Sequence, residues 1–219
     1  MRSLANLTEN ELIDFLKNQA NIEHEGRKLY DGTGTHIIQN PYELAELVTW
    51  IKSLNSSYSP NNFLEIGYSA GITNTVLCKI FDFKSITSID HITLGGTANP
   101  YTFIANLKHK PITLIAGDST SDETILKAKA LGPYDFLFID GGHTDEILHS
   151  DYVNYTKLMR QNSLIVVHDI YSSSYPTLNL VWNKIKNSLP PNAVFKEFIR
   201  ESAPITLGIG AIYLKEGNY

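Results

Sequence analysis

The chain has 219 residues, of which 42% are hydrophobic and 19% charged, a composition typical of one folded α/β domain with a modest extension. Its net charge of −5 disfavours a nucleic-acid partner, because such proteins usually present a basic face. The single cysteine, Cys78, excludes an internal disulfide framework and is expected to be a small buried helix residue. With no apolar leader and no apolar run of about 20 residues, we expect a cytoplasmic protein without a membrane segment.

The N-terminal part of the chain predicts helices. Thr8 and Glu11 form a capping-box pattern at the start of an amphipathic run that extends to about Ala20. The polar, glycine-containing segment 21–40 predicts a surface loop or a lid over a site. Pro41 is well suited to a first helical position, and apolar spacing continues the second helix to about Leu54.

From residue 59 onward, strand-like and helix-like runs alternate, which predicts a parallel sheet covered by helices on both faces. The strand-like runs are 63–66, 85–90, 112–117, 134–140 and 163–168. The helical runs are 72–81, 101–108, 122–131, 145–159 and 176–189. Two further strands, 194–200 and 207–215, have no helix between them and are therefore expected to pair antiparallel.

The first strand runs directly into a glycine turn and a helix, which is a common way to hold a nucleotide-like ligand. The turn, Gly67 to Gly71, reads G-x-x-x-G and lacks the G-x-G-x-x-G pattern that brings a helix against a pyrophosphate. Glu65 lies inside the strand beside the turn, where a carboxylate is costly to bury without a hydrogen-bonding partner. We therefore expect Glu65 to contact a cationic ligand, which disfavours a nicotinamide cofactor.

Four successive strands after the first end in an aspartate: Asp90, Asp118, Asp140 and Asp169. The carboxyl ends of parallel strands meet at one edge of a sheet, where ligands of open α/β sheets bind. For Asp118 alone, a helix-capping role is an equal alternative. Four in register predict a shared polar cleft, in which Asp90 is well placed to accept hydrogen bonds from a ribose.

The runs FLEIGYSAG, SID, GDS, YDFLFIDGGHTDEILHSDY and LIVVHDI, in this order, resemble a class I S-adenosylmethionine-dependent methyltransferase. The similarity covers about Gln39 to the C-terminus and is greatest to small O-methyltransferases and cephalosporin-hydroxylase-like proteins. It implies a Rossmann-like α/β fold whose seven-stranded, mostly parallel sheet has the order 3-2-1-4-5-7-6 with strand 7 antiparallel. It also implies an N-terminal helical extension and lid over 1–58 and a cofactor-binding methyltransferase domain over 59–219.

The resemblance further implies an S-adenosylmethionine site along the strand ends. The methionine part and the methyl group would be bordered by Glu65, Gly67, Tyr68, Gly71 and Asp140. The ribose and adenine would be contacted by Asp90, His91, Asp118 and Ser119. For Tyr68 the alternative is simple packing, and for His91 it is an exposed polar position.

In metal-dependent relatives, the positions of Asp140 and Asp169 bind Mg²⁺, and the resemblance therefore implies a divalent metal here. Relatives supply a further oxygen ligand beside the second aspartate, whereas this chain has His168 and Ile170. With His168 as the third ligand, the metal would be Mg²⁺ or, better suited to imidazole, Mn²⁺. His143 is the alternative general base for the acceptor, although it could instead only organise the start of the next helix.

These patterns predict O-methylation of a small hydroxylated molecule, such as a sugar or natural product, with metal assistance and with Asp140, His143 and Asp169 as catalytic residues. The alternative is a catalytically silent accessory protein that keeps the cofactor site. The expected partner is a small-molecule acceptor, without nucleic acid or membrane. A homodimer through the amphipathic N-terminal helix is an open option.

Overall fold

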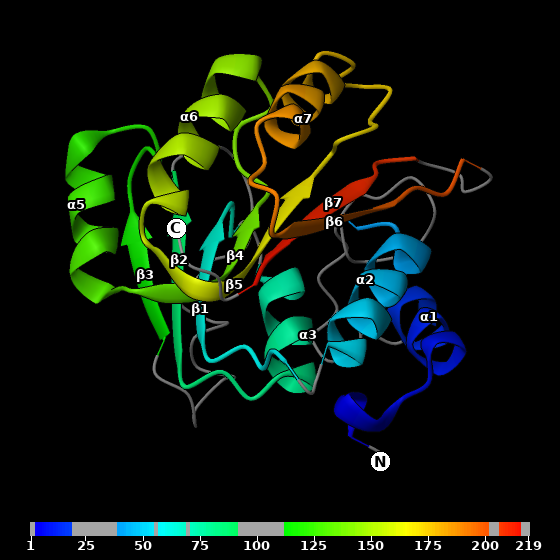
Figure 1. Ribbon diagram of the computed structural model, residues 1–219. Coiled ribbons are helices and arrows are strands. Elements are labelled where there is room, and N and C mark those ends of the chain that lie inside the picture. Colours follow the sequence, from blue (N-terminus) through cyan, green and yellow to red (C-terminus); the bar gives the residue numbers. More distant parts are fainter. Residues whose placement is uncertain are drawn as a thin grey trace.

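Seven strands of the computed structural model form a single sheet in the order β3-β2-β1-β4-β5-β7-β6 (Figure 1). The strands are β1 (Asn62–Ile66), β2 (Ser85–Asp90), β3 (Ile112–Ala116), β4 (Tyr134–Ile139), β5 (Met159–His168), β6 (Ala193–Phe198) and β7 (Ile209–Leu214). The structure describes residues 3–18, 39–54, 57–68, 71–91, 112–201 and 206–215. Strands β1 to β5 pair parallel, and β7 pairs antiparallel with both β5 and β6. The predicted strand order and the antiparallel final pair are confirmed.

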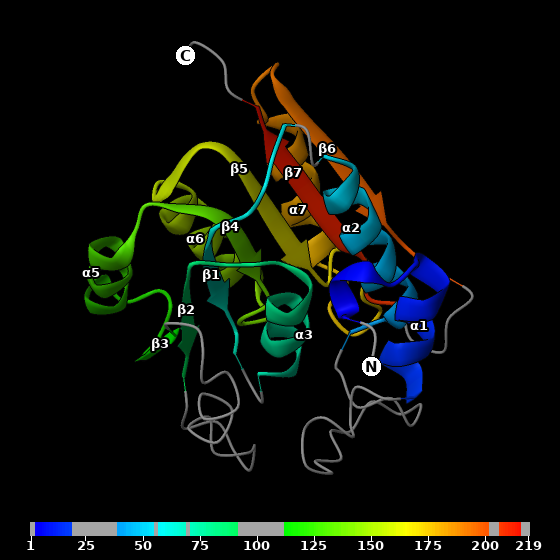
Figure 2. The same cartoon turned by 90° about the horizontal axis from the view of Figure 1, so that it is seen from below.

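Helices cover both faces of this sheet (Figures 1 and 2). One face carries α1 (Glu9–Asn18), α2 (Pro41–Ser53) and α3 (Ile72–Ile80), preceded by the 3-10 turn η1 (Leu4–Asn6). The other face carries α5 (Asp122–Leu131), α6 (Asp145–Thr156) and α7 (Leu178–Asn187). None of the helices in the described ranges is long and apolar enough to cross a bilayer. The predicted helix 101–108 and the lid segment up to residue 38 lie outside the described residues.

The first two helices begin where the capping residues predict. The backbone N–H of Thr8 donates to Glu11 Oε2 at 2.8 Å, and the N–H of Glu11 donates to Thr8 Oγ1 at 3.4 Å, which is the reciprocal pattern of a capping box. Asn40 Oδ1 accepts from the backbone N–H groups of Tyr42 and Glu43, at 3.0 and 3.4 Å. The start of α2 is therefore held firmly, with Pro41 at its first position.

Strand β5 is longer than predicted. The helical run predicted over 145–159 ends at Thr156, and β5 begins at Met159, four residues before the predicted strand. Met159 pairs with Tyr134 of β4, and the register then shifts before Leu164 pairs with Phe136. Leu158 and Met159 continue the apolar spacing of the helix, so the sequence pattern does not reveal that the chain has already joined the sheet.

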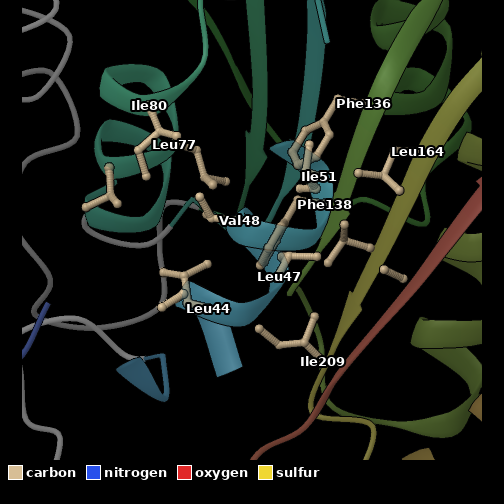
Figure 3. Close-up of a cluster of buried hydrophobic side chains, with 14 of the residues drawn as sticks. Leu44, Leu47, Val48, Ile51, Leu77, Ile80, Phe136, Phe138, Leu164 and Ile209 are labelled. Atoms are coloured by element: carbon tan, nitrogen blue, oxygen red, sulfur yellow. The ribbon is translucent and has the colours of Figure 1, made fainter. Parts of the chain in front are cut away.

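Two hydrophobic cores, one on each face, bury the middle of the sheet. In the first core, α2 and α3 pack on β4, β5 and β7 (Figure 3) through Leu44, Leu47, Val48, Ile51, Leu77, Ile80, Phe136, Phe138, Leu164 and Ile209. Cys78 is buried in this core, as predicted. Trp182 is the largest side chain of the second core. Because removing one such core leucine costs about 2–5 kcal/mol, the sheet is a rigid support and only its strand ends are available for chemistry.

A buried carboxylate ties α2 to the end of the sheet. Glu43 is fully buried, and its two oxygens accept the backbone N–H groups of Arg200 and Gly208, each at 2.9 Å. The carbonyl of Gly208 in turn accepts the N–H of Ile170 at 3.2 Å. Burial raises the pKa of Glu43, although these backbone donors oppose the rise. The start of α2 is therefore held beside the carboxyl end of β5.

Candidate active site

The glycine turn after β1 passes very close to the end of β4. Gly67 has φ +90°, and a Cβ atom there would lie 1.8 Å from the backbone oxygen of Asp140. The N–H of Gly67 donates to the carbonyl of Ile89 at 2.9 Å, and the N–H of Asp140 donates to the carbonyl of Ile66 at 2.8 Å. Only glycine suits this backbone approach. The predicted cofactor contact of Gly67 remains a prediction.

Glu65 has its hydrogen-bonding partners inside the protein. It is 1% exposed, and its Oε2 accepts from Ser88 Oγ and Asn74 Nδ2, both at 2.8 Å. Burial raises its pKa to about 8; these two donors oppose the rise, and the charges of Asp140 and Asp90 add to it. The Glu65 carboxyl is thus protonated at neutral pH, and its predicted ligand contact stays a prediction. The sequence pattern did not identify Asn74 or Ser88.

Tyr68 and Gly71 close the same turn. The N–H of Gly71 donates to the carbonyl of Tyr68 at 2.7 Å, and Gly71 has φ +72°. Tyr68 is buried in the first hydrophobic core, and a Cβ on Gly71 would lie 2.4 Å from its hydroxyl oxygen. Tyr68 therefore packs as its alternative interpretation stated. The cofactor roles predicted for both residues are not tested by this packing.

One carboxylate oxygen of Asp118 holds the turn that follows β3. Asp118 is exposed, and its Oδ1 accepts from the N–H and the hydroxyl of Thr120, at 2.8 and 2.7 Å. These bonds lower the pKa of Asp118, and exposed His91 at the end of β2 contributes to the lowering. The carbonyl of Ser119 accepts the hydroxyl of Tyr155 on α6 at 2.7 Å. The hydrogen bonds of Thr120 and Tyr155 thus fix the conformation of the turn that the resemblance places against the adenine. The adenine and ribose contacts remain predictions.

The ends of β4 and β5 bring two aspartates and two histidines together. His143 Nε2 lies 2.9 Å from Asp169 Oδ2 and 3.9 Å from Asp140 Oδ1. His168 Nδ1 lies 3.0 Å from Asp140 Oδ1 and 3.2 Å from Asp169 Oδ2. All four side chains were predicted as catalytic or metal-binding residues. The structure places them in one cluster across two neighbouring strands.

The charges in this cluster shift the pKa values of three of its members. The pKa of Asp169 lies well below its usual range because His168 and His143 outweigh the opposing effect of burial. For His168, burial disfavours the charged form, but Asp140 and Asp169 raise its pKa well above the usual value. The hydrogen bond to Asp169 raises the pKa of His143. Asp169 also has φ +59°, an uncommon backbone conformation for a side chain other than glycine, and such strain concentrates at functional sites.

Two neighbours of the cluster were not predicted as site residues. The Tyr175 ring stacks on the His143 imidazole, with centroids 4.3 Å apart and planes 14° from parallel, and so restrains the orientation of His143. Gln39 Nε2 donates to Asp140 Oδ2 at 2.8 Å. The only sequence signal for Gln39 was its place before α2. Tyr175 lies among turns after β5, where no periodic pattern indicates which side chains face the site.

The cluster can be compared with the needs of a divalent cation. Ligand atoms of Asp140, His143 and Asp169 lie within 4.8 Å of one another. Two carboxylates and an imidazole fit Mn²⁺, Fe²⁺ or Zn²⁺ and leave positions open for water or an acceptor. The predicted metal ligands were Asp140, His168 and Asp169. In the structure it is His143 that forms the group with the two aspartates. His168 already uses Nδ1 for both carboxylates and is 4% exposed, so it supports the aspartates from inside the protein.

Residues 64–170 match the family model of a methyltransferase domain. Among curated protein sequences, none matches the chain. The fold is similar to the O-methyltransferase TomG from Streptomyces achromogenes in complex with S-adenosylmethionine, with 14% identity, coverage of 94% of this chain and 90% of that one, and a TM-score of 0.59. The fold is also similar to MycE, a methyltransferase of the mycinamycin pathway in complex with Mg, S-adenosylhomocysteine and mycinamycin VI, with 14% identity, coverage of 92% of this chain and 54% of that one, and a TM-score of 0.58. For an rRNA methylase from Streptococcus thermophilus, the identity is 8%, the coverage is 80% of this chain and 97% of that one, and the TM-score is 0.60.

The sheet order and the methyltransferase-domain match together define the class of this protein. Residues 64–170 form a methyltransferase domain, and the sheet has the strand order that the resemblance to class I S-adenosylmethionine-dependent methyltransferases predicts. The matched region extends from β1 to the end of β5 and thus includes the whole set of predicted strand ends, which supports an enzyme over a silent accessory protein. At 8–14% identity, the structural similarities establish the fold and leave the acceptor open.

Proposed function

We propose that this enzyme transfers the methyl group of S-adenosylmethionine to a hydroxyl oxygen of a small molecule, such as a sugar or a natural product. The observation that carries the proposal is the cluster of Asp140, His143 and Asp169, which lies directly beside the Gly67 turn. Such a cluster offers both a proton acceptor and ligands for a cation, which an oxygen acceptor needs. The similarity of the fold to the O-methyltransferase TomG supports the choice of oxygen.

In this proposal the first three strand ends bind the cofactor. The turn from Gly67 to Gly71 borders the methionine part, and Asp90 accepts hydrogen bonds from the ribose. Asp118 and Ser119 contact the adenine through the turn that Thr120 and Tyr155 support. Most of the catalytic effect of such a site is alignment, because donor and acceptor must meet in line at about 3–3.5 Å.

The second part of the cluster handles the proton. The acceptor oxygen attacks the methyl carbon, the carbon–sulfur bond breaks, and its electron pair leaves the sulfur as a neutral thioether. The hydroxyl proton passes to Nδ1 of His143, whose Nε2 faces the carboxylate of Asp169, and this carboxylate stabilises the imidazolium that forms. The raised pKa of His143 favours holding this proton. Positioned bases of this kind contribute about 10²–10⁴-fold to the rate.

A divalent cation would be held by Asp140, Asp169 and His143, and when bound it would lower the pKa of the acceptor hydroxyl. The two carboxylates and the imidazole support this proposal of a cation site, as does the presence of Mg in the complex of MycE. With a cation in place, Asp140 and Asp169 orient the acceptor oxygen. Without one, proton removal falls to His143 alone.

Calorimetric titration with S-adenosylmethionine tests the first part of the proposal, and absence of binding at millimolar cofactor would contradict it. A panel of hydroxylated acceptors, with methylated product detected by mass spectrometry, tests the second part. The same assay after EDTA treatment separates the two routes for the proton. Loss of activity that Mn²⁺ or Mg²⁺ restores supports the cation, whereas full activity after EDTA assigns the proton to His143.

A further inference from the structure

The amide of Gln39 is buried against the proposed site with one atom unsatisfied. Gln39 is 3% exposed, and its Nε2 donates to Asp140 Oδ2 at 2.8 Å. An ionised carboxylate only accepts hydrogen bonds, so the NH₂ group must face Asp140 and the amide oxygen must face away. This oxygen, Oε1, is buried and has no hydrogen-bonding partner. An unpaired buried acceptor costs about 1–3 kcal/mol, so the observed orientation of the amide is held mainly by its bond to Asp140.

The backbone holds Gln39 in this place. The residue immediately precedes α2, whose first turn is capped by Asn40, and Glu43 anchors the same turn to Gly208 beside the end of β5. The backbone of Gln39 is thus anchored on both sides, which keeps the amide beside Asp140. A rotation of half a turn exchanges the nitrogen and the oxygen.

We propose that Gln39 supplies a neutral oxygen ligand to a divalent cation bound by Asp140 and Asp169. The inference rests on the cation-assisted form of the proposed function. Without a cation, the carboxylate of Asp140 selects the NH₂ side of the amide. A cation on Asp140 repels that side and attracts the amide oxygen, which is a suitable ligand for Mg²⁺ or Mn²⁺.

With Gln39 as a ligand, cation binding and proton transfer fall to different side chains. At the position after Asp169 the chain carries Ile170, which has no side-chain oxygen to offer. An oxygen from Gln39, which lies against Oδ2 of Asp140, would provide the third ligand. His143 is then free to take the acceptor proton at Nδ1, and two carboxylates balance the charge of the cation while the amide adds none.

The test measures Mn²⁺ binding to the full chain without cofactor or acceptor, by calorimetry and by electron paramagnetic resonance. We expect Gln39→Leu to weaken Mn²⁺ binding by at least about tenfold. Gln39→Glu should tighten it, because a third carboxylate adds charge. The matched control is Gln161→Leu, which changes an exposed glutamine in β5 and should bind Mn²⁺ like the unmodified chain.

Thermal unfolding gives a second signature that a purely structural role would not produce. Gln39→Glu loses the donor to Asp140 and adds a like charge, so it should unfold at a lower temperature than the unmodified chain without Mn²⁺. On addition of Mn²⁺, its unfolding temperature should rise by more than that of the unmodified chain. This comparison remains decisive if Gln39→Leu fails to fold.

Equal Mn²⁺ affinity of Gln39→Leu and the unmodified chain would overturn the inference. Unchanged Mn²⁺ affinity with weakened S-adenosylmethionine binding would also overturn it, and would assign Oε1 to the ammonium group of the cofactor. Absence of Mn²⁺ binding by the unmodified chain would overturn it as well. In that last case, cofactor binding and EDTA-resistant methyl transfer would leave the proposed function intact.

Discussion

The two halves of the site treat their acidic side chains differently. At the ends of β1 and β3, two acids accept from neutral donors: Glu65 from Ser88 and Asn74, and Asp118 from Thr120. At the ends of β4 and β5, Asp140 and Asp169 share partners across two strands. The described partners in the first half are therefore neutral donors, whereas in the second half they are titratable histidines.

This difference separates binding from chemistry. Burial raises the pKa of Glu65, which favours its neutral form, and Asp118 is exposed to solvent and holds its own turn. Asp169 and His168, by contrast, are charged and nearly buried, an arrangement that is costly unless the charges pair well. Strongly shifted pKa values with a defined charge partner are typical of catalytic groups. This contrast agrees with the proposed function, in which the first half binds the cofactor and the second half carries out methyl transfer.

Replacement of Asp169 by asparagine should have the largest effect, because it removes the charge that both histidines share. We expect kcat for methyl transfer to fall by about 10²–10⁴-fold, since His143 loses the carboxylate that stabilises its protonated form. The affinity for S-adenosylmethionine should change by less than about threefold, because the first half remains intact. Initial rates with saturating cofactor, together with calorimetric titration of the cofactor, measure the two quantities.

The control for this variant is Asp145→Asn, which neutralises an acid in the first turn of α6 outside the cluster. It should retain the activity of the unmodified chain. If Asp169→Asn lost cofactor affinity as strongly as it lost kcat, the division between the two halves would be wrong.

The meeting of Asp140 and Asp169 was predictable from sequence, since topology alone brings the carboxyl ends of neighbouring parallel strands together. The partners of Glu65 were not, because they depend on how α3 packs on β1 and β2. The contact of Gln39 with Asp140 spans 101 positions along the chain and depends on the packing of α2. The stack of Tyr175 on His143 depends on a chain of turns after Asp169, for which no periodicity exists. Sequence patterns thus locate strand ends well and the neighbours supplied by other elements poorly.

Asp151 packs near the turns that follow β3 and β4, and it should make the free energy of unfolding depend on pH. Its side chain on α6 is fully buried, near Ser119 on one side and Gly141 on the other, and neither oxygen has a partner at hydrogen-bonding geometry. Burial raises its pKa to about 7; Ser119 opposes the rise and the charge of Asp118 adds to it. Above the unfolded pKa of about 3.9, the folded chain holds a proton that the unfolded chain has released. Stability should therefore fall as pH rises to about 7, by on the order of 3–4 kcal/mol in all.

Chemical denaturation at pH 5 and pH 8 tests this dependence with Asp151→Asn as the comparison. The variant cannot ionise at this position, so its free energy of unfolding should decrease less between the two pH values. Glu65, whose pKa is raised to about 8, gives a dependence of the same sign in both proteins and cancels in the difference. Parallel profiles for the two proteins would show that Asp151 does not hold its proton in the folded chain.

Gly67→Ala tests the close approach of the turn after β1 to the end of β4, where the two halves of the site meet. A methyl group there would overlap the backbone of Asp140 at a positive φ, so relief requires the ends of β1 and β4 to separate. We expect a loss of about 3 kcal/mol in the free energy of unfolding, well above the ordinary cost of a glycine replacement. Gly142→Ala is the control, because its new methyl group would meet only the side chain of Ile147, which can move. Equal losses for the two variants would contradict the close approach at Gly67.

Asp90→Ala should have the smallest effect and one confined to the first half. Loss of a charge-assisted hydrogen bond to the ribose should cost about 1.5–3 kcal/mol, which corresponds to a cofactor affinity lower by about 10–150-fold. Mn²⁺ binding and kcat at saturating S-adenosylmethionine should stay close to those of the unmodified chain, because Asp140 and Asp169 are untouched. Calorimetric titration of the cofactor and of Mn²⁺ separates these outcomes. A fall in Mn²⁺ affinity would mean that the acid at the end of β2 belongs to the charged cluster, and that the two halves form one site.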